Sequence, residues 1–241
     1  MVGPVDLNSD VGEGFGHWPG GPDDELMPLL TSVNVACGFH AGDPTIMRRT
    51  CELAREHDCA IGAQVSYPDL SGFGRRFIDM RPSELTDAVV YQLGALDAFA
   101  RVNDTRVRYV KPHGALYNAI AEHEGQANAV VAAIREYDAQ LPMLGLPDSA
   151  VQRACAAAGV RFVAEGFADR AYTTEGRLVP RTQTGALITD PLAAAAQALA
   201  LAKSAVESIC VHSDTPGAVA IVAAVVKSLS ADGYQLGSFA S

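Results

Sequence analysis

The sequence has few basic residues and no cluster of them. Lysine and arginine number 18 against 28 aspartates and glutamates, which gives a formal net charge of −10 at pH 7. Nucleic acids and anionic membrane surfaces are bound through dense basic patches, so this balance argues against both as main partners. Long apolar runs are also lacking. Hydrophobic residues make up 49% of the chain, but they lie in stretches too short and too rich in alanine to span a membrane.

Cysteine is sparse as well, and its pattern argues against a disulfide framework. The five cysteines lie at positions 37, 51, 59, 155 and 210, an odd number without a CxxC pair. Secreted scaffolds that depend on disulfides carry more cysteines, usually in even numbers. We therefore expect reduced thiols that pack as small apolar side chains in a cytoplasmic protein.

What the chain does contain is a regular alternation of strand, loop and helix patterns. About seven such units follow one another, and no composition break marks a domain boundary. This order is typical of a parallel sheet with crossover helices. The number of units favours a single-domain TIM-like (β/α) barrel over residues 1–241, with a doubly wound open sheet as the alternative. The expected strands cover residues 5–10, 33–37, 60–66, 107–113, 142–146, 160–164 and 208–212.

Polar side chains gather at the expected carboxyl ends of these strands. In a barrel those ends meet at one mouth, where active sites are built. The first strand places Asp6, Asn8 and Asp10 on one face, which suits a barrel interior or a strand end that faces a site. His40 lies in a glycine-containing turn between the second strand and a helix. The other polar residues expected at the mouth are Gln64, Lys111, His113, Glu165, Asp169, Arg170, His212 and Asp214.

Some of these residues also have a simpler structural explanation. Asp43-Pro44 and Asp214-Thr215-Pro216 both look like helix starts in which the aspartate is the N-cap. Glu165 could pair with Arg170, and Lys111 could extend to the surface. Capping does not require His40, so the convergence of polar strand ends favours a functional role for this histidine.

Asp10, His40 and His113 form one candidate constellation. A carboxylate and two imidazoles on different strand ends can bind a divalent metal and leave positions open for water. The same three groups could instead work without a metal as general acid and base. The sequence leaves both possibilities open. A Schiff base on Lys111 has no support from its sequence neighbours.

These segments together resemble the LamB/YcsF family, the A subunit of bacterial ATP-dependent 5-oxoprolinase. The matching segments are residues 6–16, 34–44, 110–118, 165–172, 178–181 and 211–216, which span nearly the whole chain. The third strand departs from the family pattern, because many members have Gly-Ala-His-Pro where this chain has Gly62-Ala63-Gln64-Val65. A metal scheme that needs a histidine on that strand is therefore unsupported, whereas one that uses His113 is untouched.

The resemblance implies a seven-stranded barrel of the glycoside hydrolase/deacetylase type. It also implies ATP-dependent opening of 5-oxo-L-proline (pyroglutamate) to L-glutamate, together with B and C subunits. ATP would be a co-substrate, because the five-membered lactam is a stable amide whose carbonyl needs activation. The chain has no P-loop pattern, so either nucleotide binds in another way or a partner protein activates the substrate.

The resemblance also suggests roles for individual side chains. Asp10 or His40 would activate water, and Lys111 and His113 would hold the developing oxyanion or phosphoryl oxygens. Arg170 or Arg181 would bind the substrate carboxylate, since arginine recognises such groups in a bidentate manner. The expected catalytic residues are Asp10, His40, Lys111, His113 and Glu165. The expected substrate-binding residues are Asn8, Gln64, Arg170, Arg181, His212 and Asp214.

Two alternative functions stay open at this point. A metal-dependent carbohydrate or amide deacetylase would use Asp10, His40 and His113 as its metal ligands and would not need ATP. A non-catalytic component would hold or channel substrate within a larger assembly. The sequence does not decide whether the chain forms a homo-oligomer.

Overall fold

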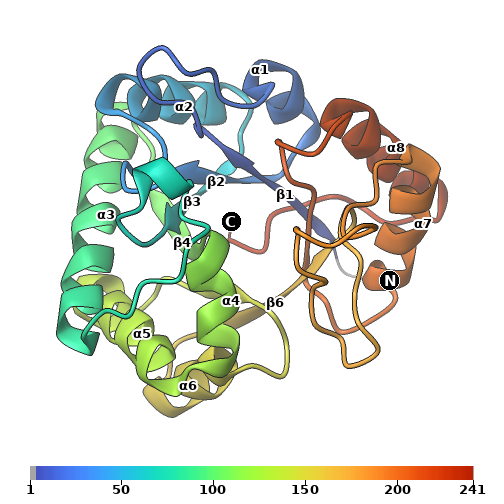
Figure 1. The fold of residues 1–241 in the computed structure, drawn as a ribbon. Helices are drawn as coiled ribbons and strands as arrows, with labels where there is room; N and C mark the ends of the chain where they lie inside the picture. Colours follow the sequence, from blue (N-terminus) through green and yellow to red (C-terminus); the bar gives the residue numbers. More distant parts are fainter. Residues whose placement is uncertain (1–3, 241) are drawn as a thin grey trace.

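Residues 4–240, which the computed structural model describes, contain a closed barrel of seven parallel strands in sequence order, with the last strand paired to the first. Figure 1 shows the helices as an outer layer around these strands. The strands are β1 (Asp6–Val11), β2 (Ser32–Ala36), β3 (Ala60–Val65), β4 (Val107–Pro112), β5 (Met143–Gly145), β6 (Phe162–Phe167) and β7 (Ser208–Cys210). The predicted (β/α) barrel is confirmed, and the doubly wound open sheet is wrong.

The helices follow the strands as crossover connections. They are α1 (Asp23–Leu26), α2 (Pro44–Glu56), α3 (Pro82–Val102), α4 (Gly114–Glu122), α5 (Glu124–Asp138), α6 (Ala150–Ala158), α7 (Pro191–Ala202) and α8 (Ala218–Ala231), with short 3-10 helices at Met27–Leu29 and Leu70–Gly72. Among residues 4–240, no helix has both the length and the apolar character that crossing a bilayer requires.

The main apolar core lies between the strands and the helices. Alternate residues of the strands, such as Leu7 and Val11 of β1, are fully buried against helix residues such as Leu93 and Ile134. All five cysteines are buried and free, and most pack in this layer. Their interpretation as small buried side chains is confirmed.

The interior of the barrel is polar. Asp6, Asn8 and Asp10 are all buried, and they contact side chains of other strands rather than solvent. The carboxylate of Asp6 accepts hydrogen bonds from Ser32 and Ser208, so even the lower part of the interior is hydrogen-bonded. The prediction that the first strand turns a polar face into a barrel is therefore correct.

The C-terminal segment closes the amino end of the barrel. Leu236 pairs with Val5 beside β1, and the Phe239 ring packs on the Tyr109 ring with 5.0 Å between centroids. The hydroxyl of Ser238 hydrogen-bonds that of Ser32 over 2.8 Å. This packing covers one end of the polar interior, and the opposite end, at the carboxyl termini of the strands, carries the candidate site.

The sixth strand and the helices after β4 differ from a simple reading of the sequence pattern. The sixth strand runs from Phe162 to Phe167 rather than over 160–164, so Glu165 points into the interior instead of lying in a loop. A buried glutamate is tolerated there because Lys111 pairs with it. The helical stretch between β4 and β5 is divided into α4 and α5, because His123 ends one helix and caps the other by accepting a hydrogen bond from the Gln126 amide.

The two aspartates that the sequence suggests as helix N-caps have different outcomes. Asp43 caps α2 as expected, since its side chain accepts hydrogen bonds from the amides of Thr45 and Ile46. Asp214 does not cap α8, which begins at Ala218 after Gly217. The predicted cap at Asp214 is therefore wrong, because its carboxylate is held by two arginines instead.

The close contact of β3 with β4 generates a stability prediction. Gly62 faces Tyr109, and an added Cβ would overlap the tyrosine ring, whose hydroxyl donates to Asn34 over 2.7 Å. Gly62→Ala should lower the free energy of unfolding by about 1–3 kcal/mol because the ring must move. Gly94→Ala in α3, where nothing lies within 4 Å of the new methyl group, should raise it by about 1 kcal/mol. Urea unfolding of both variants tests this, and equal effects would contradict it.

The buried carboxylate of Asp6 generates a pH prediction. Burial raises its pKa to about 6, even though three hydroxyl donors favour the charged form. An unfolded aspartate has a pKa of about 4, so the folded chain binds more protons between pH 4 and 6. Its contribution to the free energy of unfolding should therefore fall by about 2–3 kcal/mol as pH rises through this window.

Asp6→Asn isolates this effect. Unfolding of the variant and the native chain is compared by urea titration at pH 4, 5, 6 and 7, and the variant should gain in relative stability as pH rises. Asp87→Asn, at an exposed position on α3, is the matched control and should follow the native curve. Parallel curves for Asp6→Asn and the native chain would refute the assignment.

Candidate active site

The polar interior of the barrel ends in a buried ion-pair cluster at the carboxyl end of the strands. Lys111 of β4 is 2% exposed, and its Nζ lies 3.2 Å from Asp10 Oδ1 and 2.9 Å from Glu165 Oε1. It also donates to Asn8 Oδ1 over 3.3 Å. Lys111 is thus neither a surface lysine nor a neutral amine poised to form a Schiff base.

The charges in this cluster stabilise one another. Burial opposes charge on Lys111, but Asp10 and other neighbours, Glu165 among them, outweigh it and raise the lysine pKa well above its ordinary value. Burial likewise opposes charge on Asp10, but the positive charge of Lys111 outweighs it and lowers the pKa of Asp10 below its ordinary value. The site therefore contains a fixed ammonium group next to a fixed carboxylate at neutral pH.

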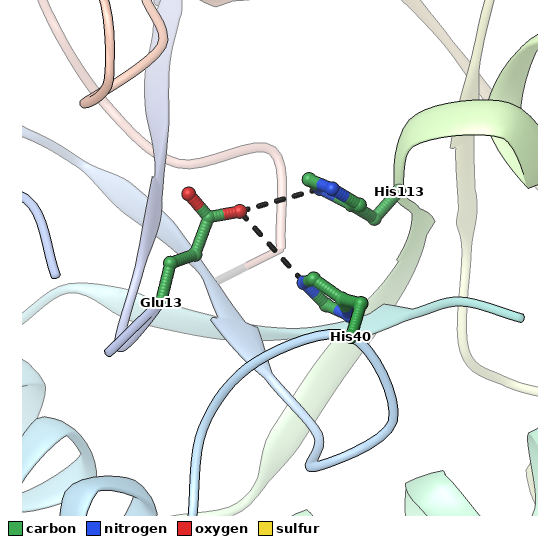
Figure 2. Close-up of side chains that lie close together, drawn as sticks. All are labelled: Glu13, His40 and His113. Carbon is green, nitrogen blue, oxygen red and sulfur yellow. Dashed lines mark ion pairs between the residues drawn. The ribbon is translucent and has the colours of Figure 1, made fainter. Parts of the chain in front are cut away.

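A second cluster lies beside the first and is drawn in Figure 2. Glu13, in the glycine-rich loop after β1, places its Oε1 3.3 Å from His113 Nδ1 and 3.7 Å from His40 Nε2. The two imidazole rings are stacked with 4.0 Å between centroids. Burial and the neighbouring His40 lower the pKa of His113 well below its ordinary value, so this imidazole is neutral.

Gln64 at the end of β3 is bonded to all three members of the second cluster. Its amide nitrogen lies 2.8 Å from Glu13 Oε1 and 2.9 Å from His113 Nδ1, and its amide oxygen lies 3.1 Å from His40 Nε2. The other ring nitrogen of His113 lies 3.0 Å from the Phe73 carbonyl oxygen. Gln64 thus contacts protein side chains, and a direct role in substrate binding stays a prediction.

A histidine–aspartate pair forms the third part of the site. His212, just after β7, places Nδ1 3.0 Å from Asp169 Oδ1, and Thr215 donates its hydroxyl to the same carboxylate. Burial opposes charge on Asp169, but His212 and these hydrogen bonds lower the pKa of Asp169 below its ordinary value. The imidazole is stacked on Phe167, with 5.1 Å between centroids. This arrangement fixes the ring and suits a general acid or base.

These groups border a cavity of about 510 Å³. Asp10, Lys111, His113 and His212 are on its wall, and Tyr117, Leu146, Phe167 and Leu178 add apolar and aromatic surface. Four arginines also line it: Arg75, Arg170, Arg177 and Arg181. Although the chain carries a net negative charge, basic side chains outnumber the acidic Asp10 and Glu122 on this wall, which suits an anionic small molecule.

The arginines are held in different ways. Arg75 and Arg181 share the carboxylate of Asp214, and the Arg181 contact is 3.0 Å. Arg170 is 6% exposed and donates to the carbonyl oxygens of Val179 and Ala186. The simpler explanation of Glu165, a pairing with Arg170, is wrong, because Glu165 is bonded to Lys111 and Asn8 inside the barrel.

The structure therefore divides the residues predicted from sequence into two groups. The cavity wall includes Asp10, Lys111, His113, Arg170, Arg181 and His212. Behind this wall lie Asn8, His40, Gln64 and Glu165, which are buried, and Asp214, which holds two arginines. The residues behind the wall are placed to orient the side chains of the wall or to set their charge. Direct contact of the residues behind the wall with substrate stays a prediction.

Sequence reasoning missed three residues. Glu13 lies in a glycine-rich loop that lacks a phosphate-binding pattern, although its position directly after a polar strand was a usable signal. Asp169 was recognised as a polar strand end but not as the partner of His212. Arg75 lies in a long loop after β3, and no spacing in the sequence connects it to the mouth.

The metal set proposed from sequence does not match this geometry. Within residues 4–240 the grouping of candidate ligand atoms is Glu13, His40 and His113, whose atoms lie within 4.8 Å of one another. Asp10 is 3.9 Å from His113 and is engaged by Lys111 and Asn34. Glu13 Oε1, His113 Nδ1 and His40 Nε2 each lie within hydrogen-bond distance of Gln64, so a metal ion bound by these three atoms would have to displace the amide.

Comparison with known proteins places this chain in a family. The sequence profile of the LamB/YcsF family matches residues 5–241. The chain is 52% identical to a protein from Streptomyces avermitilis that is named as the A subunit of 5-oxoprolinase, over 98% of this chain and 100% of the relative. It is 50% identical to the protein of the same name from Mycobacterium avium, over 98% of both chains.

Solved structures agree with this. A lactam utilization protein from Thermus thermophilus superimposes with a TM-score of 0.93 at 37% identity, over 98% of this chain and 100% of the other. A polysaccharide deacetylase from Bacillus cereus superimposes with a TM-score of 0.54 at 14% identity, over 98% and 92% of the two chains, which shows a shared barrel fold alone. By sequence and structure, this chain belongs to the LamB/YcsF family.

Proposed function

We propose that this chain is the A subunit of an ATP-dependent 5-oxoprolinase, which opens the lactam of 5-oxo-L-proline to give L-glutamate together with B and C subunits. Relatives of about 50% identity are named as the A subunit of 5-oxoprolinase, and a structural relative is called a lactam utilization protein. The observation that carries the proposal is the cavity itself, which combines a fixed ammonium–carboxylate pair, an Asp169–His212 pair and four arginines.

The chemistry explains why such a cavity is needed. Overall, 5-oxo-L-proline, ATP and two water molecules give L-glutamate, ADP and phosphate. Transfer of the γ-phosphoryl group to the lactam oxygen makes the ring carbon more electrophilic. Water then adds to that carbon, the carbon–nitrogen bond breaks and the nitrogen takes up a proton. A second water releases the phosphate. Because this sequence contains no P-loop pattern, we assign the phosphoryl transfer to the partner proteins and the ring opening to this cavity.

Each group on the cavity wall has a matching task. The Lys111 ammonium stabilises negative charge on the oxygen of the reacting carbon, because it is charged, buried and already oriented. The Asp10 carboxylate accepts a hydrogen bond from the attacking water and orients it. His212, oriented by Asp169, donates the proton that the ring nitrogen needs as the carbon–nitrogen bond breaks.

Substrate recognition follows from the arginines. 5-Oxoproline carries one carboxylate, and Arg181 reaches the cavity while its guanidinium stays anchored to Asp214. A guanidinium fixed in this way loses little side-chain entropy on binding and can contact a carboxylate through two hydrogen bonds. Arg170, which is engaged by backbone carbonyl oxygens, supports the cationic character of the wall.

Neither alternative function gains support from a particular feature of the site. The deacetylase alternative needs free metal-ligand atoms, which Gln64 engages. A component that only holds substrate would not need an imidazole fixed by a carboxylate on the cavity wall. Chelator treatment of the assembled enzyme tests the deacetylase alternative. The His212→Gln variant described below tests the alternative of a component that only holds substrate.

One prediction from the proposed function concerns catalysis. Glutamate release from 5-oxo-L-proline and ATP is measured with this chain alone and with its B and C subunits, and we expect activity from the complex. His212→Gln should lower kcat by about 10²- to 10⁴-fold, which is the usual contribution of a general acid or base. The control is His57→Gln, which changes an exposed histidine at the end of α2 and should leave kcat unchanged. No glutamate from the complex would refute the function, and unchanged kcat in His212→Gln would refute the role of His212.

Another prediction from the proposed function concerns binding of the substrate carboxylate. Arg181→Gln should raise the KM for 5-oxo-L-proline by about 10- to 100-fold with a much smaller change in kcat, because a charged hydrogen bond contributes about 1.5–3 kcal/mol. Arg153→Gln makes the same change at an exposed position on α6 and should leave KM unaltered. A change in kcat without a change in KM would move Arg181 from substrate binding to another role.

A further inference from the structure

A single side-chain amide is bonded to the three side chains that would otherwise form a metal site. Gln64 is fully buried at the end of β3. Its carboxamide lies within hydrogen-bond distance of Glu13 at 2.8 Å, His113 at 2.9 Å and His40 at 3.1 Å. These three residues lie on three different segments, after β1, β2 and β4, so the amide connects them at the mouth of the barrel.

The chemistry of the amide fixes the direction of each hydrogen bond. An amide nitrogen only donates and an amide oxygen only accepts. The nitrogen therefore donates to the Glu13 carboxylate and to Nδ1 of His113, which must be unprotonated. His113 then carries its proton on Nε2 and donates it to the Phe73 carbonyl oxygen over 3.0 Å. His40 donates its Nε2 proton to the Gln64 oxygen.

This pattern leaves no free set of ligand atoms at this point. A divalent metal at a three-residue site needs lone pairs from a carboxylate oxygen and two imidazole nitrogens that are directed at one point. In this cluster the amide takes the lone pair of His113 Nδ1 and one lone pair of Glu13 Oε1, and His40 Nε2 carries a proton. A metal ion would have to displace Gln64 and leave a buried amide without its partners, which costs free energy.

We propose that Gln64 takes the place of a divalent cation in this chain and makes Glu13, His40 and His113 a metal-free, pre-arranged polar cluster beside the catalytic cavity. The amide holds the Glu13 carboxylate between the two imidazoles and sets the tautomer of both rings. Gln64 is therefore a positioning residue, since it acts on the cavity through His113, which lines it. The inference concerns the protein alone and does not depend on the lactam substrate.

The first test measures metal binding to the purified full-length chain. Zn²⁺ content is determined by elemental analysis, and affinity is measured by titration with ZnCl₂. The native chain should bind no stoichiometric Zn²⁺, whereas Gln64→Glu, which replaces the donating nitrogen by a fourth ligand oxygen, should bind one ion at least 100-fold more tightly. Gln140→Glu adds the same charge at an exposed position after α5 and should behave like the native chain.

The second test is independent of any variant and covers the case in which Gln64→Glu fails to fold. Imidazole ¹⁵N chemical shifts and long-range couplings in the native chain at pH 7 should show the Nε2–H tautomer for both His40 and His113. Addition of one equivalent of ZnCl₂ should leave these signals unchanged. Stoichiometric Zn²⁺ in the native chain, or an Nδ1–H tautomer of His113, would overturn the proposal. Neither measurement uses 5-oxoproline, so failure of the proposed function would leave its result untouched.

Discussion

The structure depends on the buried ammonium group of Lys111. It lies inside a barrel whose interior contains the carboxylates of Asp6, Asp10 and Glu165, and it pairs directly with the last two. Removing one partner of such a buried pair typically costs about 3–5 kcal/mol, because the remaining charge is left without compensation. The same contact that allows a polar barrel interior to fold also places a fixed positive charge at the mouth. Fold stability and the electrostatics of the proposed active site therefore depend on the same residue.

Around this pair, the site is built in layers. Asn8, Asn34 and Glu165 are buried and hold the ion pair from below. The clusters of Gln64 and of Asp169 then hold imidazoles from the side, each through hydrogen bonds to a ring nitrogen. The arginines form the outer wall and come from loops rather than strands. The buried ion pairs are thus at strand ends, and the arginines of the outer wall are on longer connections.

The sequence predicted the barrel because the alternation of strand and helix signals is a local property, and local patterns survive folding. It also predicted that Lys111, His113 and His212 meet, because all parallel strands end at one edge. It did not predict the place of Glu165, since a charged residue next to an apolar run is typical of the start of a loop. The Asp214 cap failed for a related reason: an Asp-Thr-Pro motif suggests a helix start, and the competing arginines come from residues 75 and 181, far along the chain. Contacts between distant loops leave no periodic signal, so Glu13 and Arg75 were found only in the structure.

Arg170 gives the cavity wall a property beyond charge. Its guanidinium anchors the polar segment between β6 and α7, because it donates hydrogen bonds to the carbonyl oxygens of Val179 and Ala186. Val179 also lines the cavity, so one buried cation both faces the ligand space and fixes the covering segment. Each of these contacts satisfies a donor of a guanidinium that is 6% exposed, and a buried donor without a partner costs free energy. The position of this cavity arginine and the conformation of the segment after β6 are therefore linked, because neither can change without leaving polar groups of the other unpaired.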